Sequence, residues 1–177
     1  MATPAVTSAT DDAKAIVNAT AKAVAYGLRS TQSRPQTVAE ITAKLRSRYD
    51  DEVVVEGAVA VLKALGAIDD AVFARIWVED RGISRGYGRA RLAQELRRRQ
   101  VPDEIAEEAL SALDERDDLT TATELARRRA ATLPASLEPA AVARRLHAYL
   151  MRRGYNQGLS NNVAIAVSGL DRHRDWD

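Results

Sequence analysis

Three segments of the sequence carry the same apolar pattern, and this repeat constrains the fold more than any other feature. Residues 41–62, 92–113 and 146–167 align without a gap, at offsets of 51 and 54 residues. Each segment places apolar residues at helical spacing on both sides of a turn, which predicts a pair of amphipathic helices. Recurrence at this period is typical of tandem helical units. The aligned apolar positions are Ile41/Leu92/Leu146, Leu45/Leu96/Leu150, Val54/Ile105/Leu159, Ala58/Ala109/Val163 and Leu62/Leu113/Val167.

A further helical segment precedes each pair, so the sequence predicts an all-α protein of three tandem three-helix units. The preceding segments are residues 12–28, 70–80 and 118–132. Composition agrees, because 46% of the residues are hydrophobic but only 5% are aromatic, and small side chains build thin layers between helices. The predicted boundaries are a disordered tail at 1–10, units at 11–67, 68–115 and 116–170, and a C-terminal tail at 171–177.

Local signals predict where individual helices begin and end. Thr37 and Glu40 have the spacing of a capping box, and Gly66 is a typical residue after a helix C-terminus. Thr10 or Asp11 is expected to cap the first helix. The inward-facing residues are expected to be Val17, Ala21, Val24 and Leu28 in the first helix, and Val54, Ala58, Val61, Leu62 and Leu65 in the third.

Charge is distributed in blocks although the whole chain has a net charge of only +1. Residues 81–99 carry a net charge of +6, residues 100–126 carry −8, and residues 127–153 carry +6. The acidic block is expected to neutralise part of its neighbours. The chain has 22 Arg and 4 Lys, and the planar guanidinium fork suits phosphate or carboxylate. A genome rich in G and C would raise the arginine content as well.

The segment from Ile68 to Val101 combines large aromatic residues, glycines and arginines. Phe73 and Trp77 lie four residues apart, so both are expected to pack in the core, with docking of an exposed Trp77 on a partner as the alternative. Gly86 and Gly88 are expected to let the backbone turn into the next helix. A phosphate-binding loop is disfavoured because no Gly-Lys-Ser/Thr follows and no strand precedes.

The arginines of this segment are candidates for binding a partner. On the predicted helix 89–100, Leu92 and Leu96 face inward, so Arg91, Arg97 and Arg98 are expected to project outward. Like charges at this spacing repel, which favours an acidic or phosphate partner over a merely solvated face. The candidate partner- or DNA-binding residues are Arg81, Arg85, Arg89, Arg91, Arg97, Arg98, Arg127, Arg128, Arg129, Arg144, Arg145, Arg152 and Arg153.

Other kinds of site find no support in the sequence. The chain has no cysteine, which excludes disulfides and thiolate chemistry. His147 and His173 stand alone, so no metal site is expected, and no nucleophile has a positioned base. No signal peptide or membrane span is visible. The sequence therefore predicts a cytoplasmic, monomeric protein that is not an enzyme and needs no cofactor.

The sequence resembles the RecX family, regulators of the bacterial RecA recombinase. The resemblance covers about Thr37 to Val167 and follows the family's order of motifs. In the second unit the matching residues are Ile68-Asp69-Asp70, Phe73-Ala74-Arg75, Trp77-Val78, Arg81, Gly86-Tyr87-Gly88, Arg91-Leu92 and Glu95-Leu96-Arg97. In the third and first units they are Arg152-Arg153-Gly154-Tyr155 and Glu40-Ile41 with Lys44-Leu45. Two residues depart from the family pattern: Arg89, where Pro is common, and Gln100, where Gly is usual.

The resemblance implies a fold and a function. The fold would be an elongated, curved array of three-helix units lying in the groove of a RecA–DNA filament. The function would be to suppress ATP hydrolysis and strand exchange by RecA, in DNA recombination, DNA repair and the SOS response. The partners would be the RecA filament and single-stranded DNA. The alternative is a helical protein that binds single-stranded DNA without a recombinase, through electrostatic attraction alone.

Overall fold

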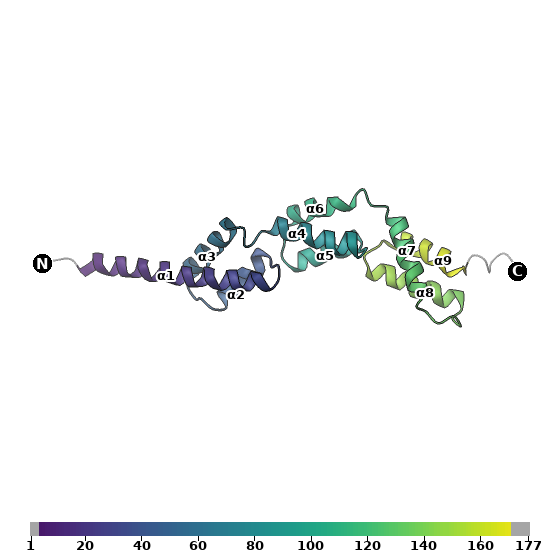
Figure 1. The fold of residues 1–177 in the computed structure, drawn as a ribbon, viewed down its shortest axis with the longest axis horizontal. Helices are drawn as coiled ribbons and strands as arrows, with labels where there is room; N and C mark the ends of the chain where they lie inside the picture. The colour runs from purple at the N-terminus through teal and green to yellow at the C-terminus, as the bar shows by residue number, and fades with distance from the viewer. Residues whose placement is uncertain (1–3, 171–177) are drawn as a thin grey trace. The chain divides into compact units, whose positions relative to one another are not determined.

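The structure, a computed structural model, describes the backbone of residues 4–170 and the side chains of residues 10–170. Every regular element in this part of the chain is a helix, so the predicted all-α class is confirmed (Figure 1). The elements are α1 (Pro4–Ser33), α2 (Val38–Arg46), α3 (Glu52–Ala64), α4 (Asp70–Val78), the π-helix η1 (Glu79–Ser84), α5 (Arg89–Arg98), α6 (Asp103–Leu110), the 3₁₀-helix η2 (Ser111–Leu113), α7 (Asp118–Ala130), α8 (Pro139–Arg152) and α9 (Gln157–Ser168).

These helices form two compact bodies. The N-terminal body holds the residues up to Phe73 together with Arg99–Pro102. The C-terminal body holds Ala74–Arg98 together with the residues from Asp103 onward. The predicted unit boundaries, and the elongated and curved arrangement, stay predictions. The C-terminal tail predicted at 171–177 lies outside the described residues.

In the N-terminal body, α1 and α3 approach each other closely at two glycines. A Cβ atom on Gly27 would collide with the side chain of Leu62, and one on Gly57 would lie 3.3 Å from Thr20. The absence of side chains at these two positions lets the helix axes approach closely. The buried residues of this core are Ala23, Ile41, Leu45, Val54, Val55, Ala58, Leu62 and Ile68.

The prediction for the first helix is wrong at its start and in part of its inward face. The helix α1 begins at Pro4 and not near Asp11, so residues 4–10 continue the helix instead of forming a tail. Val17 is 66% exposed and Ala21 is exposed, because the face that meets α3 runs through Ala23 and Gly27. In the third helix, Val61 and Leu65 are likewise exposed.

Capping side chains fix the ends of α2 and α4. The predicted capping box is confirmed: the Thr37 hydroxyl accepts from the backbone N–H of Glu40, whose carboxylate accepts from the N–H of Thr37. Asp69 accepts from the first turn of its own helix, α4. Asp70 instead accepts from the N–H of Val38 at 2.9 Å. The two adjacent carboxylates therefore cap two different helices, which holds α2 against the start of α4.

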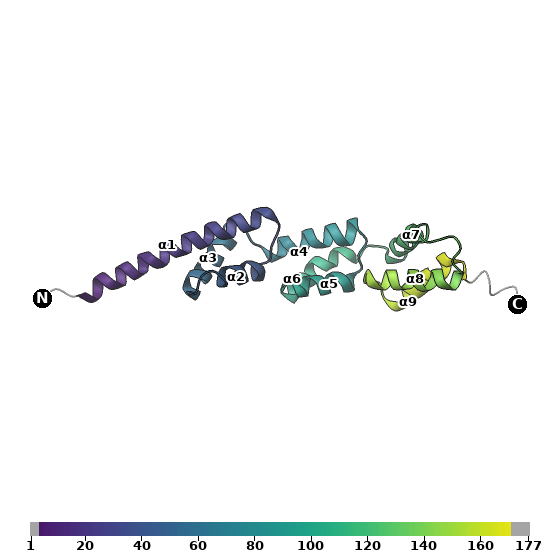
Figure 2. The same cartoon turned by 90° about the horizontal axis from the view of Figure 1, so that it is seen from below.

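The C-terminal body contains two groups of helices. We call η1, α5, α6 and η2, with the part of α4 from Ala74, the second helix group, and α7, α8 and α9 the third. Leu92 and Leu96 of α5 are fully buried, with Leu110 and Leu113 close by in α6 and η2. In both views α7, α8 and α9 lie together near the C-terminal end of the described chain (Figure 2). Their core consists of Ala122, Leu125, Ala126, Leu146, Leu150, Tyr155, Val163 and Ala164.

The apolar repeat is confirmed where it matters for packing. The columns Ile41/Leu92/Leu146 and Leu45/Leu96/Leu150 are 0% exposed in all three copies. The column Ala58/Ala109/Val163 is buried throughout as well. Ile105, Leu159 and Val167 are only half-buried. The first helix of each pair therefore supplies two columns that are buried in every copy, and the second helix supplies one.

Replacing Leu96 by alanine tests this core. The side chain is completely buried, so Leu96→Ala should lower the free energy of unfolding by roughly 2–5 kcal/mol. Leu119→Ala is a matched control, since Leu119 is 56% exposed and surface changes usually stay within about 0.5 kcal/mol. Urea unfolding followed by circular dichroism measures both. Equal losses in the two variants would contradict the assigned packing of α5.

Candidate nucleic-acid and partner interface

The second and third helix groups meet through a backbone contact between two glycines. The N–H of Gly88 donates to the carbonyl oxygen of Arg153 at 2.7 Å. A Cβ atom on Gly88 would collide with the carbonyl oxygen of Gly154, and a Cβ atom on Gly154 would lie 2.5 Å from the Cβ of Arg91. Gly154 also has φ = 91°, a conformation that side chains disfavour. The start of α5 is therefore seated directly on the turn that follows α8.

The glycines of the second group have different roles. Gly86 has φ = 67°, which confirms the predicted turn into the next helix. Gly88 has no such conformation and is needed for close approach instead. Gln100 has φ = 57° at the position where the family usually has Gly. A left-handed non-glycine residue of this kind costs about 1–2 kcal/mol.

Arg116 and Tyr155 hold the turn between η1 and α5, and neither was a candidate from the sequence. The guanidinium of Arg116 donates to the carbonyl oxygens of Gly82 at 2.7 Å and Tyr87 at 3.0 Å. Its side chain is 11% exposed and pairs with Asp118 at 2.6 Å. The hydroxyl of Tyr155 donates to the carbonyl oxygen of Gly86 at 2.9 Å. Three carbonyls of the turn are thus satisfied by side chains from the third group or its linker.

Alanine at Gly88 tests the glycine contact. The added methyl group must displace backbone of the turn at Gly154, so Gly88→Ala should lower the free energy of unfolding by about 1–3 kcal/mol, as overpacking usually does. Gly158→Ala in α9 is the control, because a Cβ there meets only the side chain of Asn156 at 3.6 Å. That variant should be neutral or gain up to about 1 kcal/mol of helix propensity. Thermal melts of both variants decide, and a neutral Gly88→Ala would refute the contact.

Tyr155 should make stability fall at alkaline pH. Burial raises the pKa of Tyr155 to about 12, against some opposition from the cation of Arg116. An unfolded tyrosine ionises near pH 10. The contribution of Tyr155 is therefore complete below about pH 10 and is lost as pH rises toward about 12.

The variant Tyr155→Phe isolates this effect. It should lose about 1 kcal/mol at neutral pH with its hydrogen bond, and its stability should fall less steeply than the parent's above about pH 10. Urea unfolding across this pH range measures both quantities. Parallel curves for the two proteins would contradict the assignment.

Several candidate arginines are engaged inside the protein. The Arg81 guanidinium lies 3.7 Å from the ring centre of Trp77. The indole N–H of Trp77 donates to Glu95 at 3.0 Å, and Glu95 also faces Arg81 at 3.7 Å. Arg89 pairs with Glu107 at 2.6 Å and with Asp114 at 2.8 Å. Arg81 and Arg89 therefore belong to intramolecular networks of the second helix group.

The prediction that Arg91 projects outward is wrong. Its side chain is half-buried and pairs with Glu95 at 2.9 Å. A second nitrogen donates to the carbonyl oxygen of Arg152 at 3.0 Å, and the guanidinium lies 3.8 Å from the ring centre of Tyr87. Arg91 thus ties α5 to the C-terminal end of α8, where a cation also meets the negative end of the helix dipole.

The side chain of Arg153 is hydrogen-bonded to the backbone of Arg85. Arg153 donates to the carbonyl oxygen of Arg85 at 2.6 Å, and its guanidinium lies 4.8 Å from the ring centre of Tyr149. Arg85 is exposed and pairs with Asp80 at 2.9 Å. Both residues are therefore accounted for by contacts within the C-terminal body.

The remaining candidates lie at the surface without a carboxylate partner. Arg97 apart, no Asp or Glu oxygen in the described part of the chain lies within 4.0 Å of their guanidinium nitrogens. Arg97 is intermediate, since it faces Asp103 at 3.8 Å with both side chains largely exposed. The unpaired and exposed residues are Arg98, Arg127, Arg128, Arg129, Arg144, Arg145 and Arg152; we call them the unpaired arginines.

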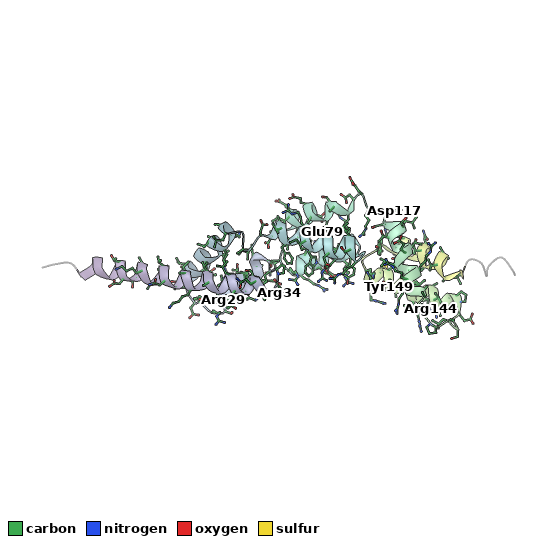
Figure 3. The ribbon with its side chains drawn as sticks, in the orientation of Figure 1. Arg29, Arg34, Glu79, Asp117, Arg144 and Tyr149 are labelled. Carbon is green, nitrogen blue, oxygen red and sulfur yellow. The ribbon has the colours of Figure 1, made fainter. Side chains whose placement is uncertain are left out.

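Four of the unpaired arginines line one surface pocket between α7 and α8, with a volume of about 420 Å³. Figure 3 shows Arg144 on the surface of α8 with side chains ending in nitrogen around it. The spacing on α8 brings Arg144, Arg145 and Arg152 to this pocket, and the small residues Ala141 and Ala148 leave room between them. The fourth cation is Arg129 of α7.

A second pocket of about 360 Å³ lies between α5 and the end of α8. It shares Arg152 with the first pocket and adds Arg91 and Arg98 from α5. Glu95 also lines it, but this carboxylate is occupied by the contacts to Arg91, Arg81 and Trp77. The sequence could not place these two pockets side by side because they depend on the glycine contact.

Other site types find no support in the structure. Among residues 10–170, no group of His, Cys, Asp and Glu is arranged to hold a metal ion. His147 lines a third pocket, between α8 and α9, and His173 lies outside the described residues. None of the described helices combines the length and apolar character needed to span a membrane.

Comparison with known proteins identifies the family. Residues 69–110 match the family model described as RecX, second three-helix domain, and residues 115–163 match RecX, third three-helix domain. The regulatory protein RecX of Thermobifida fusca (strain YX) is 39% identical over 140 residues, which cover 79% of this chain and 75% of the relative. The regulatory protein RecX of Mycobacterium sp. (strain KMS) is 36% identical over 156 residues, covering 86% and 85%.

A solved structure shares the fold. The crystal structure of RecX from Lactobacillus salivarius superposes with a TM-score of 0.67 at 18% identity, covering 85% of this chain and 97% of that one. The resemblance found in the sequence is therefore confirmed, and this chain belongs to the RecX family of regulatory proteins.

Proposed function

We propose that this protein regulates the RecA recombinase, chiefly as an inhibitor, by binding in the groove of the RecA–DNA filament. It would suppress ATP hydrolysis and strand exchange during DNA recombination and repair in the cytoplasm, without chemistry of its own. Family membership supports a regulatory role. The observation that carries the proposal is the set of unpaired arginines, because a surface with so many uncompensated cations attracts an acidic or phosphate partner.

The main competing function is binding of single-stranded DNA without a recombinase. Tight binding of this kind commonly uses exposed aromatic rings on which bases stack. In the C-terminal body, however, Tyr87 and Tyr149 each have the guanidinium of Arg153 near the ring, at 5.2 and 4.8 Å from the ring centre. Trp77 is covered by Arg81. These rings are poorly available to bases, so a protein partner would have to supply much of the affinity.

Arg97 and Arg98 test the proposal on α5. Both side chains are exposed, so Arg97→Ala/Arg98→Ala should keep the melting temperature of the parent. The variant should lose much of its ability to slow DNA-dependent ATP hydrolysis by RecA, since each charge-assisted hydrogen bond is worth roughly 1.5–3 kcal/mol. Arg91 stays unchanged in this variant because its side chain ties α5 to α8.

The matched control removes two exposed arginines that already have carboxylate partners. Arg46 pairs with Glu52 and Arg85 with Asp80, so Arg46→Ala/Arg85→Ala changes the net charge equally but spares the unpaired arginines. The control should inhibit like the parent. If the parent itself leaves ATP hydrolysis by RecA unchanged, the proposed function is wrong; if only the test variant remains fully inhibitory, α5 is not part of the interface.

A further inference from the structure

We propose that the two pockets sharing Arg152 form one continuous track for the sugar-phosphate backbone of single-stranded nucleic acid, read without contacts to the bases. This inference rests on the proposed function and deepens it, since it assigns these arginines to nucleic acid rather than to acidic protein. The track would run from Arg98 on α5 across Arg152 to the cluster at Arg144, Arg145 and Arg129.

The geometry makes the two pockets one surface. Arg152 lines both of them, and its backbone carbonyl accepts from Arg91 at 3.0 Å. The contact of Gly88 with Gly154 lies directly beside this bond. Helix α5 therefore cannot shift relative to the end of α8 without breaking both contacts, so the backbone positions that carry Arg98 and Arg152 are fixed relative to each other before any ligand arrives.

The charge of the track is almost uncompensated. The two linings together contain six arginines and one acid, Glu95. The carboxylate of Glu95 already accepts from Arg91 at 2.9 Å and from Trp77 at 3.0 Å. What remains is a groove of one sign in which closely spaced guanidinium groups repel one another. A chain of phosphates relieves this repulsion at several points at once.

The lining favours phosphate over an acidic protein surface. Stable protein interfaces are centred on a buried apolar or aromatic anchor, whereas the only large apolar side chain in the two linings is Met151, 41% exposed. The small residues Ala141 and Ala148 leave open space between the guanidinium groups. A guanidinium group can donate two parallel hydrogen bonds to the oxygens of one phosphate. A phosphodiester backbone therefore matches the charge of this site and its lack of an apolar anchor.

Bases are not expected to contribute. Tyr87 contacts Arg91, which lines the second pocket; the Arg91 guanidinium lies 3.8 Å from its ring centre and that of Arg153 lies 5.2 Å from it. A ring already contacted by two guanidinium groups is less available for stacking with a base. Binding should therefore depend little on base sequence and strongly on salt.

The test measures binding to a fluorescent oligothymidylate by anisotropy, without recombinase, from about 50 to about 200 mM salt. The test variant is Arg144→Ala/Arg145→Ala/Arg152→Ala in the full chain. The control is Arg29→Ala/Arg46→Ala/Arg85→Ala, which removes three exposed arginines outside the track. We expect the test variant to bind at least roughly tenfold more weakly, with a salt slope shallower by about 2 for three lost phosphate contacts. The control should keep the parental slope, and both variants should melt like the parent.

Parallel assays of ATP hydrolysis by RecA separate this inference from the proposed function. A test variant that keeps the parental affinity and slope for oligothymidylate overturns the track, and if it also loses inhibition, the face binds acidic protein instead. A parent that binds no oligothymidylate at the lowest salt overturns it too. If the slope changes as expected while the parent never inhibits RecA, the track stands and the proposed function fails. A purine oligonucleotide that binds far more tightly than oligothymidylate would contradict readout through the backbone alone.

Discussion

The contact of Gly88 with Gly154 is the constraint on which the C-terminal body depends. It brings two turns to van der Waals distance and leaves no room for a side chain on either. Once the backbones meet there, Arg153 reaches the carbonyl of Arg85 and Tyr155 reaches that of Gly86. The candidate interface follows from the same contact, because Arg152 joins the two arginine-lined pockets only where the end of α8 touches α5. A structural glycine thus determines a charged surface some residues away.

Much of the fold could be predicted from the sequence because its core depends on simple periodicity. The columns at Leu92 and Leu96 recur in three copies, and each copy is buried. The first helix could not be predicted in this way. It packs through Gly27 and Ala23, where the decisive property is a small or missing side chain, so a search for apolar period chose Val17, which is exposed. Hydrophobic periodicity identifies helix faces that bury apolar side chains, but it does not identify faces whose small residues let two helices approach each other closely.

The candidate site was less predictable, because some arginines are bound inside the protein and others of the same helix remain exposed. Arg91 and Arg98 lie seven residues apart on one helix, and only the first is tied to Glu95 and to the carbonyl of Arg152. Glu95 lies on the same helix, but the other partner, the carbonyl of Arg152, comes from α8, far away in the sequence. Arg116 was missed for a related reason: a single arginine within an acidic block looks like local compensation. In the fold it donates to carbonyls of Gly82 and Tyr87, a role that no local pattern indicates.

The block pattern of charge explains which arginines remain available. The acidic residues 100–126 supply Glu107 and Asp114 to Arg89, so they neutralise part of the basic block before them. No ion pair in the described chain joins them to the basic block 127–153. The two basic blocks have the same net charge of +6, but they differ in how many of their arginines are paired within the protein. The earlier block is used largely to build the second helix group, and the later block keeps its charge at the surface, where a long-range field can attract an anionic partner.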